Sequence, residues 1–373
     1  MRGDTIIVRT VSGSVWGETV SLLEELRIGT KDGDGPDAFG FIHSLALFPD
    51  GVIAVFDGSV PALRLFGADG KHLRTLGRVG AGPGEYRNQS LGLAVDRDGV
   101  LLMYDPGNVR LNRWREDGTL LPSWYAPGRL FTAQALQVDT AGNTYIRVTL
   151  EQPEAGKEWK MGLARLESNG LVADTLPAPV IPGDAPASGT FFDPVKHWHL
   201  NRTGDLVSGF SGRYAIAVSG RDRVVRIERV VQPVSLLPDE RKNYQEVADV
   251  LRQNPNPMVR SAPSPATVPS EKPFWRSIQS DLDGRIWVEV HGKAEPFDPP
   301  SRPRPPGAPP VPPIRWREPR AYDVFRKDGA YLGRLNFPVR TSVYEARGDR
   351  IWAVQRGEDD EQYIVRYRIS GIR

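Results

Sequence analysis

The sequence of 373 residues contains no cysteine. This absence excludes disulfide bonds, thiolate metal sites and a cysteine nucleophile in one step. It also contains no run of about 18 apolar residues, so no membrane-spanning helix is expected. Residues 1–5 have no apolar signal region, which leaves a cytosolic protein or one whose leader lies outside this sequence.

An excess of charge of one sign is lacking as well. Lysine and arginine number 48 against 46 aspartates and glutamates, so the formal net charge is +2. A charge this small gives no large field to attract nucleic acid or an anionic membrane. The apolar content of 39% fits a folded chain rather than a disordered one. We expect a monomer with no nucleic-acid partner and no membrane span.

What the sequence does contain is a repeat. A short apolar run recurs six times, each time introduced by a turn, and a second run that usually ends in a glycine turn follows it. The first runs are residues 52–57, 100–105, 143–148, 205–210, 285–290 and 350–355, and the second runs are residues 62–70, 110–118, 162–170, 214–220, 321–329 and 363–371. Such periodic use of one unit is typical of a repeat architecture.

The first two units align almost without gaps. Residues 45–51 match residues 93–99 at an offset of 48, and both stretches end in Asp-Gly. Asp-Gly between alternating apolar runs predicts a tight hairpin, because glycine accepts the positive φ of such a turn. Each unit therefore reads as four antiparallel strands, A to D, which together make one propeller blade.

The two ends of the chain complement each other. The last unit supplies strands A, B and C and then ends at Arg373, whereas residues 23–29 near the N-terminus resemble a strand D. We predict that this N-terminal strand completes blade six, which removes the open edges of the array. The expected fold is all-β, a six-bladed β-propeller formed by residues 1–373 as one domain.

One segment carries a family resemblance. Residues 82–86 (Gly-Pro-Gly-Glu-Tyr), followed by residues 91–96, resemble the blade junction of NHL-repeat β-propellers. The resemblance implies the fold but no single function, because propellers host hydrolases, lyases and pure binding platforms. Bacterial members are often exported, so it also implies a periplasmic or secreted location.

The insertions are expected on one face of the disc. The long segments, residues 149–161, 176–196, 234–273 and 291–320, all join strand B to C or strand D to A. Residues 238–254, within the insertion 234–273, have apolar residues at helical spacing, which predicts a helix that covers this face as a cap. Residues 298–313 are dominated by proline and predict an extended polyproline loop within the insertion 291–320. Long loops over a rigid scaffold are where binding usually takes place.

The start of each strand A should surround the mouth of the central channel on this face. The residues that the alignment places there or nearby are basic or polar: His43, Gln134, Lys196, His197, Arg213, Arg276 and Arg340. Guanidinium groups bind carboxylates or phosphates in a forked geometry. We therefore predict a site for a small anionic ligand or an acidic peptide, although pairing with acidic loop residues would neutralise the same side chains. Trp198 and Trp275 lie next to this mouth and are candidates for ligand contact or for the core.

A metal site is not expected. His43 resembles the stretch that supplies one zinc ligand in peptidylglycine amidating lyases, but the aligned strands offer no further histidine opposite it. Asp57, Asp105 and Glu289 end strands B and could approach an ion as in calcium-dependent lactonases. Asp57 and Asp105 are more readily explained as caps of the following turns. We predict no metal and no cofactor.

Nucleophile motifs are missing too. No serine stands in a Gly-X-Ser-X-Gly elbow, and no phosphate-binding glycine loop occurs. The histidines of the sequence His197-Trp198-His199 share one face of a strand but would supply only two ligands. Trp287 and Trp352 occupy equivalent places in blades five and six, which predicts packing between blades. The sequence favours a binding or interaction protein, and a hydrolase or lyase at the same axial pocket stays open as the alternative.

Overall fold

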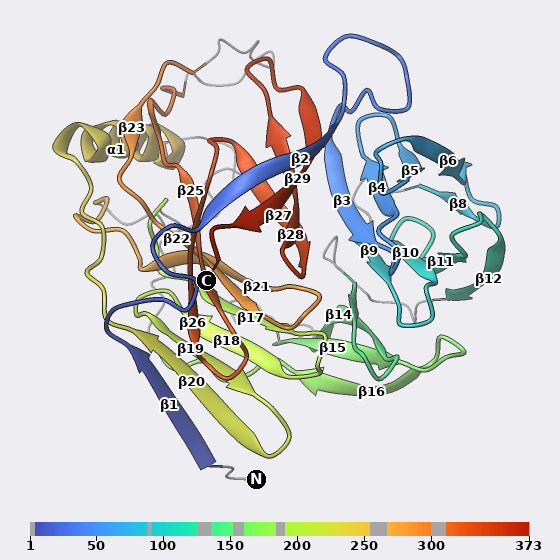
Figure 1. Ribbon diagram of the computed structural model, residues 1–373, viewed down its shortest axis with the longest axis horizontal. Coiled ribbons are helices and arrows are strands. Elements are labelled where there is room, and N and C mark those ends of the chain that lie inside the picture. Colours follow the sequence, from blue (N-terminus) through green and yellow to red (C-terminus); the bar gives the residue numbers. More distant parts are fainter. Residues whose placement is uncertain are drawn as a thin grey trace.

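The protein is a six-bladed β-propeller, as the repeat predicted (Figure 1). The computed structural model describes residues 4–87, 92–125, 136–151, 160–183, 191–253, 267–299 and 311–372. Six sheets of four or five strands are arranged around a central axis, and the chain passes from one blade to the next in sequence order. None of the helices in this part of the chain is long and apolar enough to cross a membrane.

Strands A to D of each blade are antiparallel, and strand A lies nearest the axis. In blade six the N-terminal strand β2 supplies strand D. From the axis outward, the strands are β3 (Ile42–Leu47), β4 (Ile53–Asp57), β5 (Ala62–Phe66) and β6 (His72–Leu76) in blade one; β9 (Gly92–Val95), β10 (Leu101–Asp105), β11 (Arg110–Trp114) and β12 (Leu120–Tyr125) in blade two; β13 (Gln137–Val138), β14 (Thr144–Glu151), β15 (Lys160–Leu166) and β16 (Val172–Pro177) in blade three; β17 (Lys196–Leu200), β18 (Leu206–Phe210), β19 (Ala215–Ser219) and β20 (Arg223–Arg229) in blade four; β21 (Trp275–Ser280), β22 (Ile286–Val290), β25 (Arg320–Phe325) and β26 (Tyr331–Phe337) in blade five; and β27 (Thr341–Arg347), β28 (Arg350–Arg356), β29 (Gln362–Ser370) and β2 (Ser21–Ile28) in blade six.

The turn between strands A and B has the same chemistry in four blades. Its first residue uses a side-chain oxygen to accept the backbone N–H four positions later, and a glycine with positive φ stands three positions later. These first residues are Asp96, Asp139, Asn201 and Asp281. Because these contacts are local, the sequence dictates the position of each turn and therefore where strand A ends.

The N-terminal strand closes the ring. β2 pairs antiparallel with β29, from Ser21 opposite Ser370 to Ile28 opposite Ile364. Ile28 is buried in a cluster that combines side chains of blades one and six. The predicted closure of blade six is confirmed, and it joins chain segments more than 330 residues apart through backbone hydrogen bonds.

A second N-terminal strand was not predicted. β1 (Asp4–Thr10) pairs in parallel with β20 and makes blade four five-stranded. Between β1 and β2, the amides of Val15 and Trp16 donate to Tyr331 O at 3.1 Å and Leu332 O at 2.8 Å on blade five. Trp16 is buried there in the core between blades five and six. The N-terminal segment thus lies along the outer strands of three consecutive blades.

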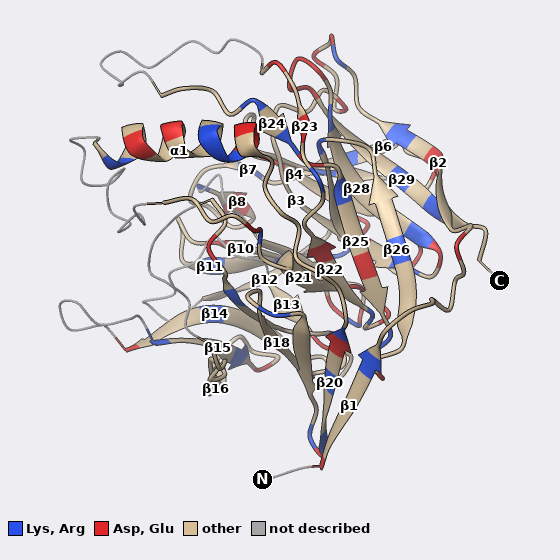
Figure 2. Ribbon diagram, turned by 90° about the vertical axis from the view of Figure 1, so that its left-hand side faces the viewer, with Lys and Arg blue, Asp and Glu red and all other residues tan. Residues whose placement is uncertain are grey.

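The helix α1 (Pro238–Arg252) confirms the helix predicted in the insertion between blades four and five. Its Tyr244 and Ala248 pack on Phe192 and Val268. Figure 2 shows the disc edge-on, with α1 and the connected ends of β14 and β15 on one side and the C-terminus on the other. We call the side with α1 the decorated face and the opposite side the plain face.

The proline-rich segment predicted at residues 298–313 falls largely on residues 300–310, which lie outside the described residues. At its base, β23 (Glu295–Pro296) pairs with β24 (Trp316–Arg317). Asn243 of α1 donates to Pro313 O at 3.1 Å and accepts from Arg315 N at 2.8 Å. The base of the loop is therefore fixed to the helix. A further short pair, β7 (Arg78–Val79) with β8 (Glu85–Tyr86), lies in the junction between blades one and two.

Candidate functional site: the axial channel

The inner strands of all six blades surround a cavity of about 580 Å³ on the propeller axis. β3, β9, β13, β17, β21 and β27 each contribute lining residues. The end of each strand A lies at the plain face, where the A–B turns are, and its start lies toward the decorated face. The cavity therefore has one end toward each face of the disc.

One position of the repeat forms a ring of six side chains around this cavity. In five blades the residue that opens the A–B turn donates its N–H to the carbonyl four positions later. This residue marks the same position in each blade, and in blade six that position is Arg347. The residues two positions earlier all line the cavity: Ala46, Ala94, Gln137, His199, Gln279 and Glu345. Blades one and two thus contribute only methyl groups, which leave room, while the other four contribute polar groups.

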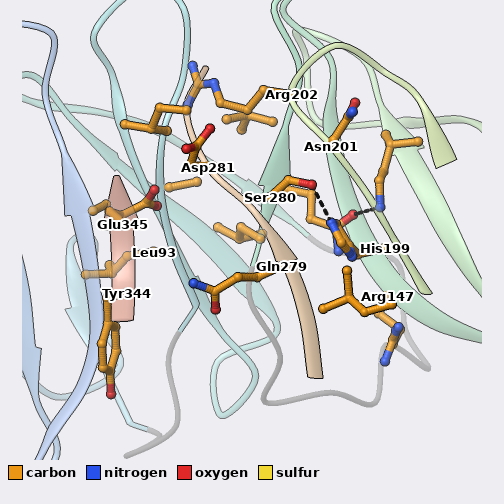
Figure 3. A pocket seen from close by; sticks show the side chains of 18 of the residues that line it. Leu93, Arg147, His199, Asn201, Arg202, Gln279, Ser280, Asp281, Tyr344 and Glu345 are labelled. Carbon is orange, nitrogen blue, oxygen red and sulfur yellow. Dashed lines mark hydrogen bonds between the residues drawn. The ribbon is translucent and has the colours of Figure 1, made fainter. Parts of the chain in front are cut away.

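His199 is a neutral, hydrogen-bonding member of this ring. Its Nε2 lies 2.7 Å from Ser280 Oγ (Figure 3), and its buried Nδ1 has no hydrogen-bond partner among the described residues. Burial, followed by the charge of Arg147, lowers the pKa of His197 to about 4, and burial lowers the pKa of His199 to about 3. Both rings are therefore uncharged at neutral pH and available as hydrogen-bond groups.

The rings of His197 and His199 meet edge to face with centroids 6.0 Å apart, which confirms that they share one face of the strand. The described residues hold no group of three or more histidines, aspartates or glutamates placed to bind a metal ion.

Glu345 is the acidic member of the ring. A β-bulge between Val343 and Glu345 interrupts the pairing of β27 with β28 and alters the direction of the side chains that follow. Burial raises the pKa of the Glu345 carboxyl to about 8; the nearby charge of Arg202 opposes this, and that of Asp281 adds to it. Figure 3 shows Glu345 in the channel wall, on the side opposite His199. Among the described residues no hydrogen bond or ion pair engages its carboxyl group.

Asp281 lies near Glu345 but is occupied by its own turn. It accepts hydrogen bonds from Arg285 Nε at 2.5 Å and Trp287 Nε1 at 2.7 Å, in addition to the backbone N–H groups of the A–B turn. Its carboxylate is therefore structural. Glu345 is the carboxyl group at this end of the channel that a ligand could engage.

The end of the cavity toward the decorated face is cationic. Lys196, the first residue of β17, lines the cavity and is exposed, and no carboxylate of the described residues forms an ion pair with it. Arg147 lies over the ring of Trp198 at 4.6 Å and donates to Trp198 O at 3.0 Å. Lys196 and Arg147 place positive charge at this end of the cavity.

Of the seven residues that the sequence nominated, Lys196 and His197 line this cavity. Gln134 lies outside the described residues. His43 is half-buried beside the ring of Phe41 and, like Arg213, does not line the cavity. The guanidinium of Arg213 donates to Pro182 O at 3.0 Å.

The remaining two, Arg276 and Arg340, are held by acidic residues, and neither lines the cavity. Arg276 pairs with Glu318 at 2.7 Å, and Arg340 pairs with Asp360. This is the neutralisation by acidic residues that the sequence left open. Their charges are therefore largely compensated at the mouth.

Arg276 belongs to a buried charge cluster beneath α1. Lys272, whose side chain is fully buried, places Nζ 2.7 Å from Glu240, 3.1 Å from Glu318 and 3.1 Å from Gly292 O. Burial alone would raise the pKa of Glu318, but the hydrogen bond from His291 and the charge of Arg276 outweigh it, so this pKa lies well below its usual value. The cluster connects the helix to the B–C loop of blade five.

The other carboxylates considered from the sequence are structural. Asp57 accepts from Ser59 N at 3.0 Å in the turn that follows it, and also from the amides of Gly40 and Phe41, both at 3.1 Å. Asp105 accepts from Gly107 N at 2.9 Å in its following turn and from Arg87 N at 3.0 Å. The prediction that both cap turns is confirmed. Glu289 pairs with Arg320 and accepts from Ser277 Oγ at 3.0 Å.

The tryptophans divide as follows. Trp275 is buried, with Nε1 donating to Arg213 O at 3.2 Å, whereas Trp198 lines the cavity. Trp287 and Trp352 are buried in the clusters between blades five and six and between blades six and one, as predicted.

Residues that the sequence did not nominate make up most of the cavity's chemistry. Arg147, Gln279 and Glu345 were not singled out, and His199 was noted only as a neighbour of His197. The signal was available in the repeat, because the ring lies at a fixed distance before each A–B turn. The start of strand A is a poorer reference point than the turn, because bulges disturb the register there at His43 and Arg276.

Comparison with known proteins supports the fold alone. No protein-family model matches the sequence, and no curated protein sequence matches it. Among solved structures, a member of the DUF4221 family from Bacteroides vulgatus aligns with a TM-score of 0.54 and 11% identity over 94% of this chain and 98% of the other. A protein of Bacteroides fragilis named for its inferred export aligns with a TM-score of 0.51 and 11% identity over 98% and 100% of the two chains. A gluconolactonase of Xanthomonas campestris gives a TM-score of 0.42 and 11% identity over 89% and 87%.

Proposed function

We propose that this propeller is a binding protein that takes a small anionic molecule, or the acidic end of a peptide, into its axial channel from the decorated face. The observation that carries the proposal is the ammonium group of Lys196, which lines the cavity without an ion pair among the described residues. Arg147 adds a second cation at the same end. Hydrogen bonds from a charged donor to a carboxylate or phosphate are stronger than hydrogen bonds between neutral groups.

The test titrates two anionic probes by calorimetry. One is N-acetyl-trialanine, a carboxylate without an amine, and the other is inorganic phosphate. We expect Lys196→Met to weaken binding of the carboxylate probe about 10-fold, since a charge-assisted hydrogen bond contributes roughly 1.5–3 kcal/mol. Lys71→Met, which removes an exposed lysine from a turn of blade one, is the matched control and should leave binding unchanged. Equal affinities for the wild type and Lys196→Met, or no binding of either probe, would contradict the proposal.

The second candidate is a hydrolase or lyase, lactonase- or esterase-like or amidating-lyase-like, acting at the same pocket. Glu345 favours it, because a carboxyl group that stays protonated at neutral pH is what a general acid requires. A screen of lactone and ester substrates separates the two functions. Turnover that disappears in Glu345→Gln would establish the enzyme, and no turnover across the screen would leave the binding protein.

We also propose that the chain is an NHL-repeat-like propeller with a periplasmic or secreted location. Both statements rest on the resemblance of residues 82–86 and 91–96 to that family's blade junction. Cell fractionation of the source organism tests the location, and recovery of the protein in the cytoplasm alone would contradict it.

A further inference from the structure

We infer that the ligand of the axial channel is a zwitterion, with a carboxylate bound at Lys196 and an ammonium group bound at Glu345, at two levels that lie about 10 Å apart along the axis. An extended peptide of about three residues has this separation between its charged ends. This inference rests on the proposed function and names the class of ligand that the same cavity takes.

The separation follows from the positions of the two charges along the inner strands. Lys196 begins β17, and His199, three residues later, belongs to the same ring of the repeat as Glu345. A strand rises about 3.3 Å per residue, so the two levels are about 10 Å apart along the axis. One cavity spans both levels, because both residues line it.

The ring offers three acceptors to an ammonium group. Glu345 and Gln279 have no side-chain hydrogen bond among the described residues, and both point into the cavity in Figure 3. With the ring proton of His199 on Nε2, next to Ser280, its buried Nδ1 is an acceptor without a partner. These three groups come from blades four, five and six, and an ammonium group has three donors.

The opposite arc of the cavity is apolar. Ala46 and Ala94 occupy the ring positions of blades one and two, and Leu93, Val95 and Leu136 lie beside them. The small alanines leave space on this side, and the larger side chains give it an apolar surface. An apolar wall facing a polar arc suits the side chains and backbone of a short peptide better than it suits a polyol, which would leave hydroxyl groups unpaired.

Binding of an ammonium group should release a proton from Glu345. The charged groups that face this carboxyl are Arg202 from blade four, Asp281 from blade five and Arg347 from its own strand, with neutral His199 across the channel. In this setting the Glu345 pKa of about 8 keeps the group mainly protonated at pH 7. An ammonium partner favours the ionised form, so binding at pH 7 should release close to one proton.

The experiment compares three peptides on the full chain: trialanine, N-acetyl-trialanine, which lacks the ammonium group, and trialanine amide, which lacks the carboxylate. Calorimetry at pH 7 in Tris and in MOPS gives the affinity and the number of protons released. We expect trialanine to bind at least about 10-fold more tightly than either analogue, since each analogue loses one charged contact. Proton release should accompany trialanine and not N-acetyl-trialanine.

The variants assign each end of the ligand. Glu345→Gln should abolish proton release and the preference for trialanine over N-acetyl-trialanine, whereas Lys196→Met should abolish the preference over trialanine amide. If N-acetyl-trialanine binds as tightly as trialanine and still depends on Lys196, the zwitterion is wrong and the anion site stands. If no carboxylate-bearing peptide depends on Lys196, the proposed function fails together with this inference.

Discussion

Replacing Lys272 by methionine should lower the free energy of unfolding by about 3–5 kcal/mol, because it leaves two buried carboxylates without their shared cation. The Lys272 ammonium forms ion pairs with Glu240 and Glu318 and donates a hydrogen bond to Gly292 O. The side chains of Lys272 and Glu240 are almost inaccessible to solvent, so water cannot replace the lost contact. Urea denaturation at pH 7 measures the change.

Two further variants test whether the lost stability comes from unpaired buried charge. Lys31→Met removes an exposed ion pair with Asp359 and should leave the free energy of unfolding almost unchanged. Adding Glu240→Gln to Lys272→Met removes one of the stranded charges and should recover part of the lost stability. A double variant no more stable than Lys272→Met would show that the cost arises from packing and not from unpaired charge.

The cluster also explains why a helix covers this part of the decorated face. Glu240 lies in the first turn of α1, where its Oε2 accepts the N–H of Leu237 at 3.1 Å. Through Lys272 and Glu318 it is connected to Arg276 at the start of β21. These ion pairs therefore form one connected set from α1 to the first strand of blade five.

The blades could be predicted from sequence because their information is local. An Asp-Gly turn with its side-chain cap involves about five consecutive residues, and it recurs at fixed places in the repeat. The closing strand β2 could be found for the same reason, since it resembles the fourth strand of blade one. β1 could not, because a parallel edge strand has no hairpin turn to announce it.

The site was predicted only in part because its register and its charge balance depend on distant contacts. β-bulges lie at the starts of β3, β21 and β27, next to His43, Arg276 and Tyr344, and a bulge leaves no sequence signature comparable to a turn. The partner of Arg276, Glu318, is 42 positions away in a loop. The basic residues predicted at the mouth therefore carry less uncompensated charge than their number suggests. The A–B turns locate the cavity better, because the ring lies two residues before each of them.

Glu345→Gln should stabilise the protein increasingly as the pH rises from 5 to 8. Burial holds the native pKa of this carboxyl at about 8, whereas in the unfolded chain it is near 4.3. Between these values the native state binds more protons than the unfolded state, so the wild type loses up to about 1.4 kcal/mol of stability per pH unit through this group. Glutamine stays neutral, and the variant's advantage at pH 8 should reach the order of 3–5 kcal/mol in urea denaturation.

The difference in free energy of unfolding between the variant and the wild type separates the effect of Glu345 from that of the histidines. The lowered pKa values of His197 and His199 make both proteins more stable as the pH rises toward about 6.5, a slope of opposite sign that the two share. Glu246→Gln on the exposed face of α1 serves as the control and should run parallel to the wild type. Parallel curves for Glu345→Gln and the wild type from pH 5 to 8 would mean that this carboxyl is already ionised in the native channel, where it would attract an ammonium group without releasing a proton.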